Sequence, residues 1–356
     1  MNQRVVKLRK VLDKHNLDAL LAYSPYNRRY LSYFTGTAGY VVITKQDAVF
    51  ITDFRYVEQA KQQCQGFSIV NHEGKVFETV AEVIKKNQAV NVGFEQNHVT
   101  YGEYQTLVEK LAGFTLTPTS NLVEELRMFK DEEELQLIRH AAKIADDAFA
   151  HLLTWIKPGM TEIEVKNELE FTMRKLGASG ASFDTIVASG LRSALPHGVA
   201  SKKVIEKGDM ITIDFGAIYE GYISDVTRTF AIGEPGEELR KIYEIVRQAQ
   251  LAGVEQIRAG MTGKEADAIC RTIIDEAGYG EYFGHSTGHA IGLEVHEGPG
   301  LSFRSEVELQ PGMVVTVEPG IYVPGVGGVR IEDDIVITED GNEIIVHSPK
   351  ELIVLD

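Results

Sequence analysis

The segment MITIDFGAIYEGYISDVTRTF, residues 210–230, carries two aspartates within two apolar strand patterns that flank a turn at Tyr219–Gly221. Asp214 and Asp225 are eleven positions apart, and their midpoint lies between Tyr219 and Glu220. An even-length loop centred there would place the carboxylates opposite each other on one face of a hairpin. Like charges directly opposite are destabilising, so this arrangement predicts a bound cation. An odd or bulged loop would instead leave both side chains in solvent.

A second segment, HSTGHAIGLEVHE at residues 285–297, brings together His285, His289 and His296. A lone histidine is most often a structural residue. Three histidines in thirteen positions, beside glycines that allow close backbone approach, favour a site.

Two further segments place acidic side chains on apolar strands. VVTVEPGIY, residues 314–322, ends a strand pattern in Glu318 before a Pro-Gly turn. GGVRIEDDIVI, residues 327–337, alternates Arg330, Glu332 and Asp334 with apolar residues. A charged strand face between buried strands is costly unless its charges are paired or bound to metal.

The charges of these residues balance those of two divalent cations. Asp214, Asp225, Glu318 and Glu332 carry four negative charges and His289 is neutral. Such a pair can hold a bridging hydroxide as nucleophile, because metals about 3.5–4 Å apart lower the pKa of bound water towards ~7 and polarise a carbonyl. Carboxylate-rich ligation favours Mn²⁺, and the imidazole leaves Co²⁺ and Zn²⁺ as alternatives.

The remainder of the second domain consists of alternating helix and strand patterns. WIKPGMTEIEV at 155–165 is echoed by QIRAGMTGKEA at 256–266, which suggests two related α+β halves. Helices are predicted at 130–156, 161–176, 237–258 and 263–277, and strands at 185–188, 210–217, 222–230, 313–318, 329–337 and 343–346.

The first third of the chain reads as a small α/β domain. A helix is predicted at 5–15, strands at 18–23, 39–44 and 48–52, and another helix at 56–63. The pattern loosens at 116–125, so the domain boundary is placed near residue 125. The predicted domains are therefore 1–125 and 126–356.

Composition excludes several classes of protein. A net charge of −16 argues against binding of nucleic-acid phosphates. Cys64 and Cys270 are far apart and outside any CxxC, which fits a reducing compartment. The first residues lack the apolar core of a signal peptide, and no stretch approaches the ~20 apolar residues of a membrane span. A cytoplasmic protein without nucleic-acid or membrane partners is expected.

Taken in order, the motifs resemble those of the prolidase and aminopeptidase P family of pita-bread metallopeptidases. The first-domain segment SPYNRRYLSYFTG and the junction LRMFKDEEELQLIRHA also look like that family, so the resemblance covers nearly the whole chain. The matching catalytic motifs are PHG at 196–198, the D-x10-D pair at 214 and 225, HSTGHAIGLEVHE at 285–297, EPGIY at 318–322 and GGVRIED at 327–333. The resemblance implies a creatinase-type N-terminal domain, which limits substrate length and forms a homodimer, followed by a pita-bread catalytic domain.

The resemblance also implies roles for the metal ligands. Asp214 and Asp225 would bind one metal ion, with Asp225 bridging to the second. His289, Glu318 and Glu332 would complete the pair, with Glu332 also bridging. Glu318 would relay the proton from the nucleophilic water to the leaving amine.

Residues around the ligands are assigned by the same resemblance. His197 and His296 would position the substrate and stabilise the oxyanion. Arg330 would steer Glu332 or the substrate, and His285 would support the histidine ligand. For His197, His285 and Arg330, purely structural roles stay open.

The implied activity is hydrolysis of Xaa-Pro bonds in small peptides with proline at the second position. Xaa-Pro dipeptidase is the favoured form, since the first domain is short; Xaa-Pro aminopeptidase on longer peptides is the alternative. Some prolidases place an arginine after His-Glu-x-Pro, where this chain has Gly300. Methionine aminopeptidases usually lack such a first domain, and creatinase-like hydrolases lack the metal set. A non-catalytic peptide-binding module of the same fold is a remote alternative.

Overall fold

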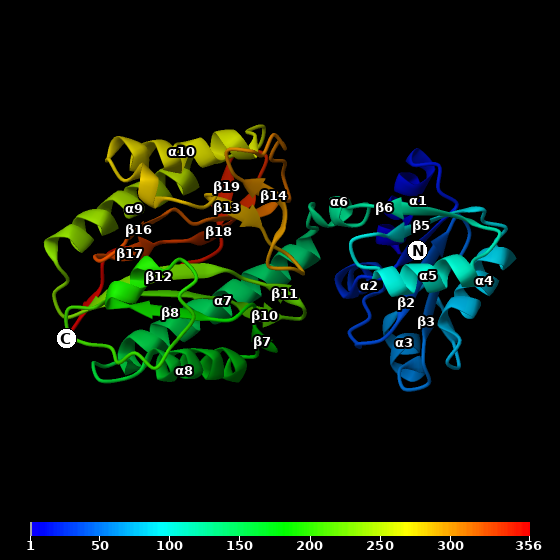
Figure 1. Cartoon of the computed structure of the whole chain (residues 1–356), viewed down its shortest axis with the longest axis horizontal. Coiled ribbons are helices and arrows are strands. Elements are labelled where there is room, and N and C mark those ends of the chain that lie inside the picture. Colours follow the sequence, from blue (N-terminus) through cyan, green and yellow to red (C-terminus); the bar gives the residue numbers. More distant parts are fainter. Residues whose placement is uncertain (1) are drawn as a thin grey trace. The chain divides into compact units, whose positions relative to one another are not determined.

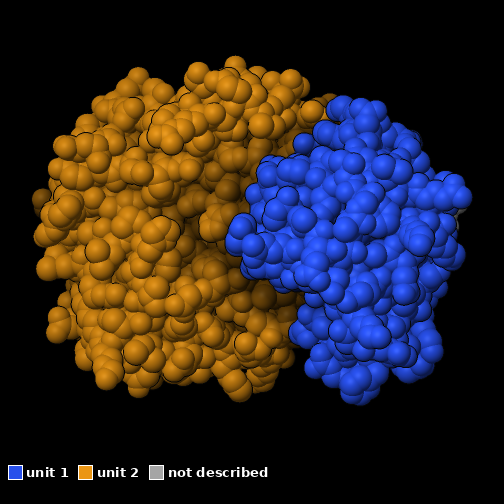
Figure 2. Space-filling view, turned by 45° about the vertical axis from the view of Figure 1, so that its right-hand side comes forward, with its two compact units in different colours: residues 1–127 blue, residues 128–356 orange. Residues whose placement is uncertain are grey.

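The computed structural model describes residues 2–356, which fall into two units that meet between Arg127 and Met128 in the chain (Figure 2). Each unit has its own sheets and its own buried apolar residues. The helices within residues 2–356 lack the combination of length and apolar character that a membrane span requires.

The first unit is built on a mixed six-stranded sheet with the strand order β4-β3-β2-β1-β5-β6 (Figure 1). All four residues of the central strand β1 (Ala19–Ala22) are buried, as expected for a strand covered on both faces. The segment whose pattern loosens contains the edge strand β6 (Thr115–Thr119), where Pro118 can be tolerated. The other elements are α1 (Gln3–Lys14), α2 (Pro25–Ser32), β2 (Tyr40–Thr44), β3 (Ala48–Thr52), α3 (Val57–Gln63), β4 (Ser68–Asn71), α4 (Val76–Lys86), β5 (Asn91–Glu95), α5 (Tyr101–Lys110) and α6 (Glu124–Arg127).

In the second unit, helices lie on two sides of several small sheets. Helices α7 (Glu132–Trp155) and α8 (Glu162–Lys175) lie on one side, and α9 (Glu237–Gln256) and α10 (Gly263–Glu276) on the other (Figure 1). The strands are β7 (Gly180–Ala181), β8 (Ile186–Ser189), β9 (Met210–Phe215), β10 (Ala217–Tyr219), β11 (Tyr222–Ile223), β12 (Val226–Ile232), β13 (Gly288–Ala290), β14 (Glu297–Leu301), β15 (Val314–Val317), β16 (Gly320–Val323), β17 (Gly327–Arg330), β18 (Asp333–Ile337), β19 (Asn342–Ile344) and β20 (Val354–Leu355). The 3-10 helices are η1 (Gly190–Ala194) and η2 (Gly280–Tyr282).

These strands form sheets of four, five, three and two strands. The orders are β20-β12-β9-β8, β14-β13-β15-β18-β19, β11-β10-β7 and β16-β17.

The echoed segments adopt the same structure. Helices α8 and α10 both begin with a capping box, from Thr161 and Thr262. The preceding glycines, Gly159 and Gly260, have φ of 94° and 86°, and their amides donate to the carbonyls of Ile205 and Leu309. The turn between α7 and α8 thus matches the turn between α9 and α10, as expected for two related halves.

The register of the 210–230 hairpin differs from the one predicted. Asp214 pairs with Thr227 rather than with Asp225. The two turn residues are Glu220 and Gly221, so the centre of the turn lies one residue later than the predicted centre between Tyr219 and Glu220. Both turn residues have positive φ, 44° and 79°. A two-residue turn with positive φ at both positions matches strand twist best and favours glycine second, which explains the shift. The two aspartates are therefore diagonal rather than opposed.

The predicted strand at 222–230 is also interrupted, at Ser224–Asp225. A Cβ on Gly216 would lie 1.8 Å from the Ser224 carbonyl oxygen, so only glycine permits this close crossing between two sheets. The Asp225 amide leaves the ladder and donates to Asp334 Oδ2 over 2.9 Å.

A second interruption divides the predicted strand 329–337 into β17 and β18, leaving Ile331 and Glu332 between them. The Glu332 amide donates to the Thr227 carbonyl at 3.1 Å. Asp225 and Glu332 thus both lie where a strand passes from one sheet to another.

Candidate metal centre

One pocket of about 440 Å³ in the second unit is lined by every site residue proposed from the sequence. They come from segments far apart in the chain: His197, Asp214, Asp225, His285, His289, His296, Glu318, Arg330 and Glu332.

Three carboxylates form the densest acidic group of this pocket. One oxygen each of Asp214, Asp225 and Glu332 lies within 4.8 Å of the other two. Burial, reinforced by the neighbouring carboxylates, raises the pKa of both Asp225 and Glu332 well above its ordinary value. Asp214 Oδ1 is buried without a hydrogen-bond partner among the residues described.

Such a group fits divalent cations. Clustered carboxylates repel one another when ionised, and the buried orphan oxygen of Asp214 is a ligand atom not satisfied by the protein. Hard oxygen donors suit ions such as Mn²⁺ or Mg²⁺, and a cation would relieve both the repulsion and the orphan oxygen.

His289 extends the acidic group towards Glu318. Its Nε2 lies 3.7 Å from Asp225 Oδ2 and 3.5 Å from Glu318 Oε1. Burial and the nearby His296 lower the pKa of His289 to about 4, which leaves the neutral imidazole that binds metals. Glu318 follows β15, and its amide donates to the Thr287 carbonyl. Burial raises the pKa of Glu318 to about 8, although Arg330 opposes the shift.

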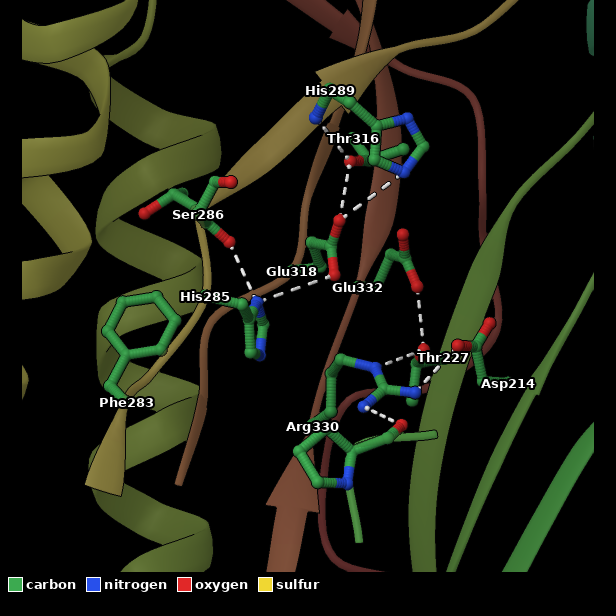
Figure 3. Close-up of polar contacts among 12 residues, drawn as sticks. Asp214, Thr227, Phe283, His285, Ser286, His289, Thr316, Glu318, Arg330 and Glu332 are labelled. Atoms are coloured by element: carbon green, nitrogen blue, oxygen red, sulfur yellow. Dashed lines mark hydrogen bonds and ion pairs between the residues drawn. The ribbon is translucent and has the colours of Figure 1, made fainter. Parts of the chain in front are cut away.

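Arg330 is buried at the end of β17 and contacts three sides of the site (Figure 3). Its Nη2 donates to Asp214 Oδ2 at 2.6 Å and its Nε to Thr227 Oγ1 at 3.0 Å. Thr227 Oγ1 in turn donates to Glu332 Oε2 at 2.6 Å. Arg330 therefore contacts Asp214 directly and reaches Glu332 through Thr227.

His285 lies beside Glu318 and Tyr322. Its Nδ1 is 3.8 Å from Glu318 Oε2, and its Nε2 is 2.9 Å from the Tyr322 hydroxyl. That hydroxyl also accepts a 2.6 Å hydrogen bond from Arg330 Nη1. The support expected from His285 for His289 is thus indirect, because both rings border Glu318 (Figure 3).

The two remaining histidines are exposed at the pocket. The rings of His296 and His289 have centroids 4.4 Å apart. His197 follows Pro196, whose carbonyl accepts a hydrogen bond from Arg330 Nη1 at 3.2 Å. Both histidines can therefore reach a molecule in the pocket while staying outside the carboxylate group.

Five apolar side chains, which we call the apolar wall, also line the pocket and suit a small hydrophobic ring or side chain. The apolar wall is formed by Phe183, Ile186, Pro196, Val199 and Val295. The combination of an acidic floor, exposed histidines and an apolar wall can bind a small molecule that has both a polar centre and an apolar part.

Reasoning from sequence missed three contributors. Thr227 stands two positions after Asp225 within the predicted strand 222–230, and this spacing could have revealed it. Tyr322 ends the motif EPGIY but carries no charge to mark it. Thr316, whose hydroxyl donates to Glu318 Oε1 at 3.2 Å, lies within an apolar strand and gives no signal.

Two family models match the chain. The model of metallopeptidase family M24 matches residues 136–339, and that of the creatinase/prolidase N-terminal domain matches residues 4–129.

Individual proteins match nearly the full length. An Xaa-Pro dipeptidase of Pyrococcus furiosus is 41% identical and is covered over 100% of its length, with 99% of this chain aligned. The solved Xaa-Pro dipeptidase from Bacillus anthracis is 58% identical with a TM-score of 0.98, covering 99% of each chain. An X-Pro aminopeptidase structure from Thermotoga maritima is 41% identical with a TM-score of 0.92, covering 97% of this chain and 100% of that one. The predicted fold class, a creatinase-type N-terminal domain before a pita-bread domain, is confirmed.

Proposed function

This chain belongs to metallopeptidase family M24, as its motifs predicted, and we propose that it hydrolyses Xaa-Pro peptide bonds as an Xaa-Pro dipeptidase. The observation that carries the proposal is the buried group of Asp214, Asp225 and Glu332 in a pocket with an apolar wall. The Xaa-Pro dipeptidases of Pyrococcus furiosus and Bacillus anthracis, similar over nearly the whole chain, support it.

Divalent metal use follows from the family, and we propose two ions, Mn²⁺ by preference, with Co²⁺ or Zn²⁺ as alternatives. Asp214 and Asp225 would hold one ion, and His289, Glu318 and Glu332 would complete the pair, with Asp225 and Glu332 shared. When bound, such ions supply an acidified water and polarise the scissile carbonyl.

The side chains around the ions hold the substrate and move the proton. An Xaa-Pro bond has no N–H, so the enzyme cannot grip it there, and the leaving nitrogen must be protonated. Glu318 would take the proton of the nucleophilic water on a carboxylate oxygen and pass it to the prolyl nitrogen. His197 and His296 would orient the substrate carbonyl, and the apolar wall would pack against the pyrrolidine ring.

The test is hydrolysis of an Xaa-Pro dipeptide and of an Xaa-Pro-Y-Z tetrapeptide with Mn²⁺ present. Cleavage of the dipeptide alone identifies a dipeptidase. Cleavage of the tetrapeptide supports the aminopeptidase alternative, which Gly300 and the similar X-Pro aminopeptidase from Thermotoga maritima favour. Absence of bound metal after purification, together with no hydrolysis after Mn²⁺ addition, would leave only the non-catalytic peptide-binding module.

We also propose that the first unit limits substrate length and that it forms a homodimer. A monomer in light scattering would contradict the homodimer. A cytoplasmic location is supported by Cys64 and Cys270, which are buried free thiols.

A further inference from the structure

Glu162 lies outside the metal centre, and its buried carboxylate accepts five hydrogen bonds. It is the first residue of α8 and has no exposed surface. Its Oε1 accepts from the amide and the hydroxyl of Ser189, each at 2.8 Å. Its Oε2 accepts from the amide and the hydroxyl of Ser201, at 3.0 and 2.7 Å, and from Arg192 Nη1.

These donors stand at the two ends of one loop. Ser189 is the last residue of β8, and Ser201 follows twelve positions later. A buried carboxylate is costly unless its charge and lone pairs are satisfied, so the arrangement is stable only when both ends of the loop are in place. Glu162 therefore binds the two ends of the loop to the start of one helix.

The loop between these ends carries part of the pocket. It includes Pro196, His197 and Val199, all of which line the pocket. Arg192 makes a second link, because its Nη2 donates to the Val199 carbonyl at 2.9 Å while its Nη1 is held by Glu162. The Val199 amide then donates to the His197 carbonyl at 2.8 Å. A chain of contacts thus runs from Glu162 to the backbone of His197.

We propose that Glu162 is a positioning residue for catalysis, acting through the 190–201 loop to set the place of His197 in the pocket. The inference rests on the proposed function, since His197 matters only if the pocket turns over a substrate. Loops that carry functional residues need such anchoring, because a misplacement of about 1 Å at a site can cost ~10²-fold in rate.

The principal variant is Glu162→Gln, which keeps the size but turns an amide N–H₂ towards donors that need an acceptor. We expect kcat/KM for an Xaa-Pro dipeptide to fall by about 10–100-fold, the usual effect of losing a partner that orients site residues. Bound metal should be unchanged, since the proposed ligands lie on other elements. Glu168→Gln, on the same helix and paired with His151, is the matched control and should behave as the wild type.

A double-mutant cycle with His197→Ala separates positioning from a general structural role. If Glu162 acts through His197, then E162Q should lower kcat/KM only slightly further in a protein that already carries His197→Ala. Multiplicative losses in the double variant would overturn the inference. Ser201→Ala removes a single donor and serves as the milder variant if E162Q folds poorly; it should show the same pattern with a smaller loss.

Hydrogen exchange tests the same contacts without requiring activity. Amides at Ser189 and Ser201 should exchange faster in E162Q than in the wild type, while amides of α9 and α10 stay unchanged. Unchanged exchange at both serines would overturn the inference, and so would faster exchange with full activity. If the wild type itself cleaves no Xaa-Pro peptide, the proposed function fails, and with it the catalytic part of the inference; exchange still shows whether Glu162 holds the loop.

Discussion

Arg330 Nη2 donates to Asp214 Oδ2 over 2.6 Å, and the two side chains expose only 4% and 14% of their surfaces. The guanidinium also donates to Thr227, Tyr322 and the Pro196 carbonyl. A planar group with several fixed donors is needed to reach all four partners, and the single ammonium of lysine cannot replace it.

Arg330→Lys should therefore lower kcat/KM by about 10–100-fold, as losses of ligand-orienting partners do. Steady-state kinetics on an Xaa-Pro dipeptide, together with a metal titration, measures this. A lysine variant with wild-type kinetics would show that positive charge alone is needed at this position.

Asp225→Asn and Glu332→Gln should abolish turnover while the fold is kept. Both side chains are buried among other carboxylates, so loss of one negative charge does not strain the protein but removes a proposed bridge between the ions. The loss of kcat/KM should exceed ~100-fold, the upper range for substitutions of residues that hydrogen-bond to metal ligands. Circular dichroism checks the fold, and near wild-type rates in either variant would contradict the bridging role.

Thr227→Val should weaken metal binding without disturbing β12. Valine keeps the branched shape but removes the hydroxyl that donates to Glu332 and accepts from Arg330. We expect metal affinity to fall by about 10–100-fold in a titration followed by activity. Thr227→Ser, which keeps the hydroxyl, is the control; equal losses in both variants would point to packing rather than hydrogen bonding.

Removal of metal with a chelator should end activity and lower the melting temperature. Cations that bind only the folded protein add about 2.7 kcal/mol of stability at a hundredfold excess over Kd. Differential scanning calorimetry should show a melting temperature that rises with added Mn²⁺, and activity should return with it. A melting temperature independent of Mn²⁺ would argue against a site in the folded protein.

The stability that Glu162 contributes should depend on pH in the acidic range. Burial raises the pKa of Glu162, but hydrogen bonds from Ser201, Ser189 and Arg192 outweigh it, so the net pKa lies below the ordinary 4.5. A carboxyl with a lowered folded-state pKa stabilises the protein fully above its ordinary pKa, and this stability is lost as the pH falls through the folded value.

The difference in melting temperature between wild type and E162Q should thus be largest near neutral pH and shrink below about pH 4.5. Thermal melts of both proteins across pH 3–7 measure it. A difference that stays constant down to pH 3 would mean that folding does not shift the pKa of Glu162, and a difference that grows would mean that folding raises it.

Much of the fold was predictable because its signals are local. The helices at 132–155 and 237–256 and the capping boxes at Thr161 and Thr262 follow from apolar spacing and from cap residues three positions before a glutamate. The acidic residues were likewise visible as charges within apolar strands.

The register and the sheet crossings were not predictable in this way. The turn at Glu220–Gly221 moved the pairing of Asp214 from Asp225 to Thr227, because positive φ at two positions outweighs a symmetric placement of the aspartates. The breaks at Asp225 and Glu332 depend on close contacts such as Gly216 against Ser224, which join different strands.

The sequence alone therefore determined the chemistry: which carboxylates and histidines are available, and the family to which their order belongs. Only the tertiary structure decided how they meet. Arg330 lies against Asp214, Thr227 links Arg330 to Glu332, and Glu162 holds the loop of His197. The physical reason is that ligand identity is a property of single residues, whereas a hydrogen bond between residues 103 to 116 positions apart exists only after the sheets have packed.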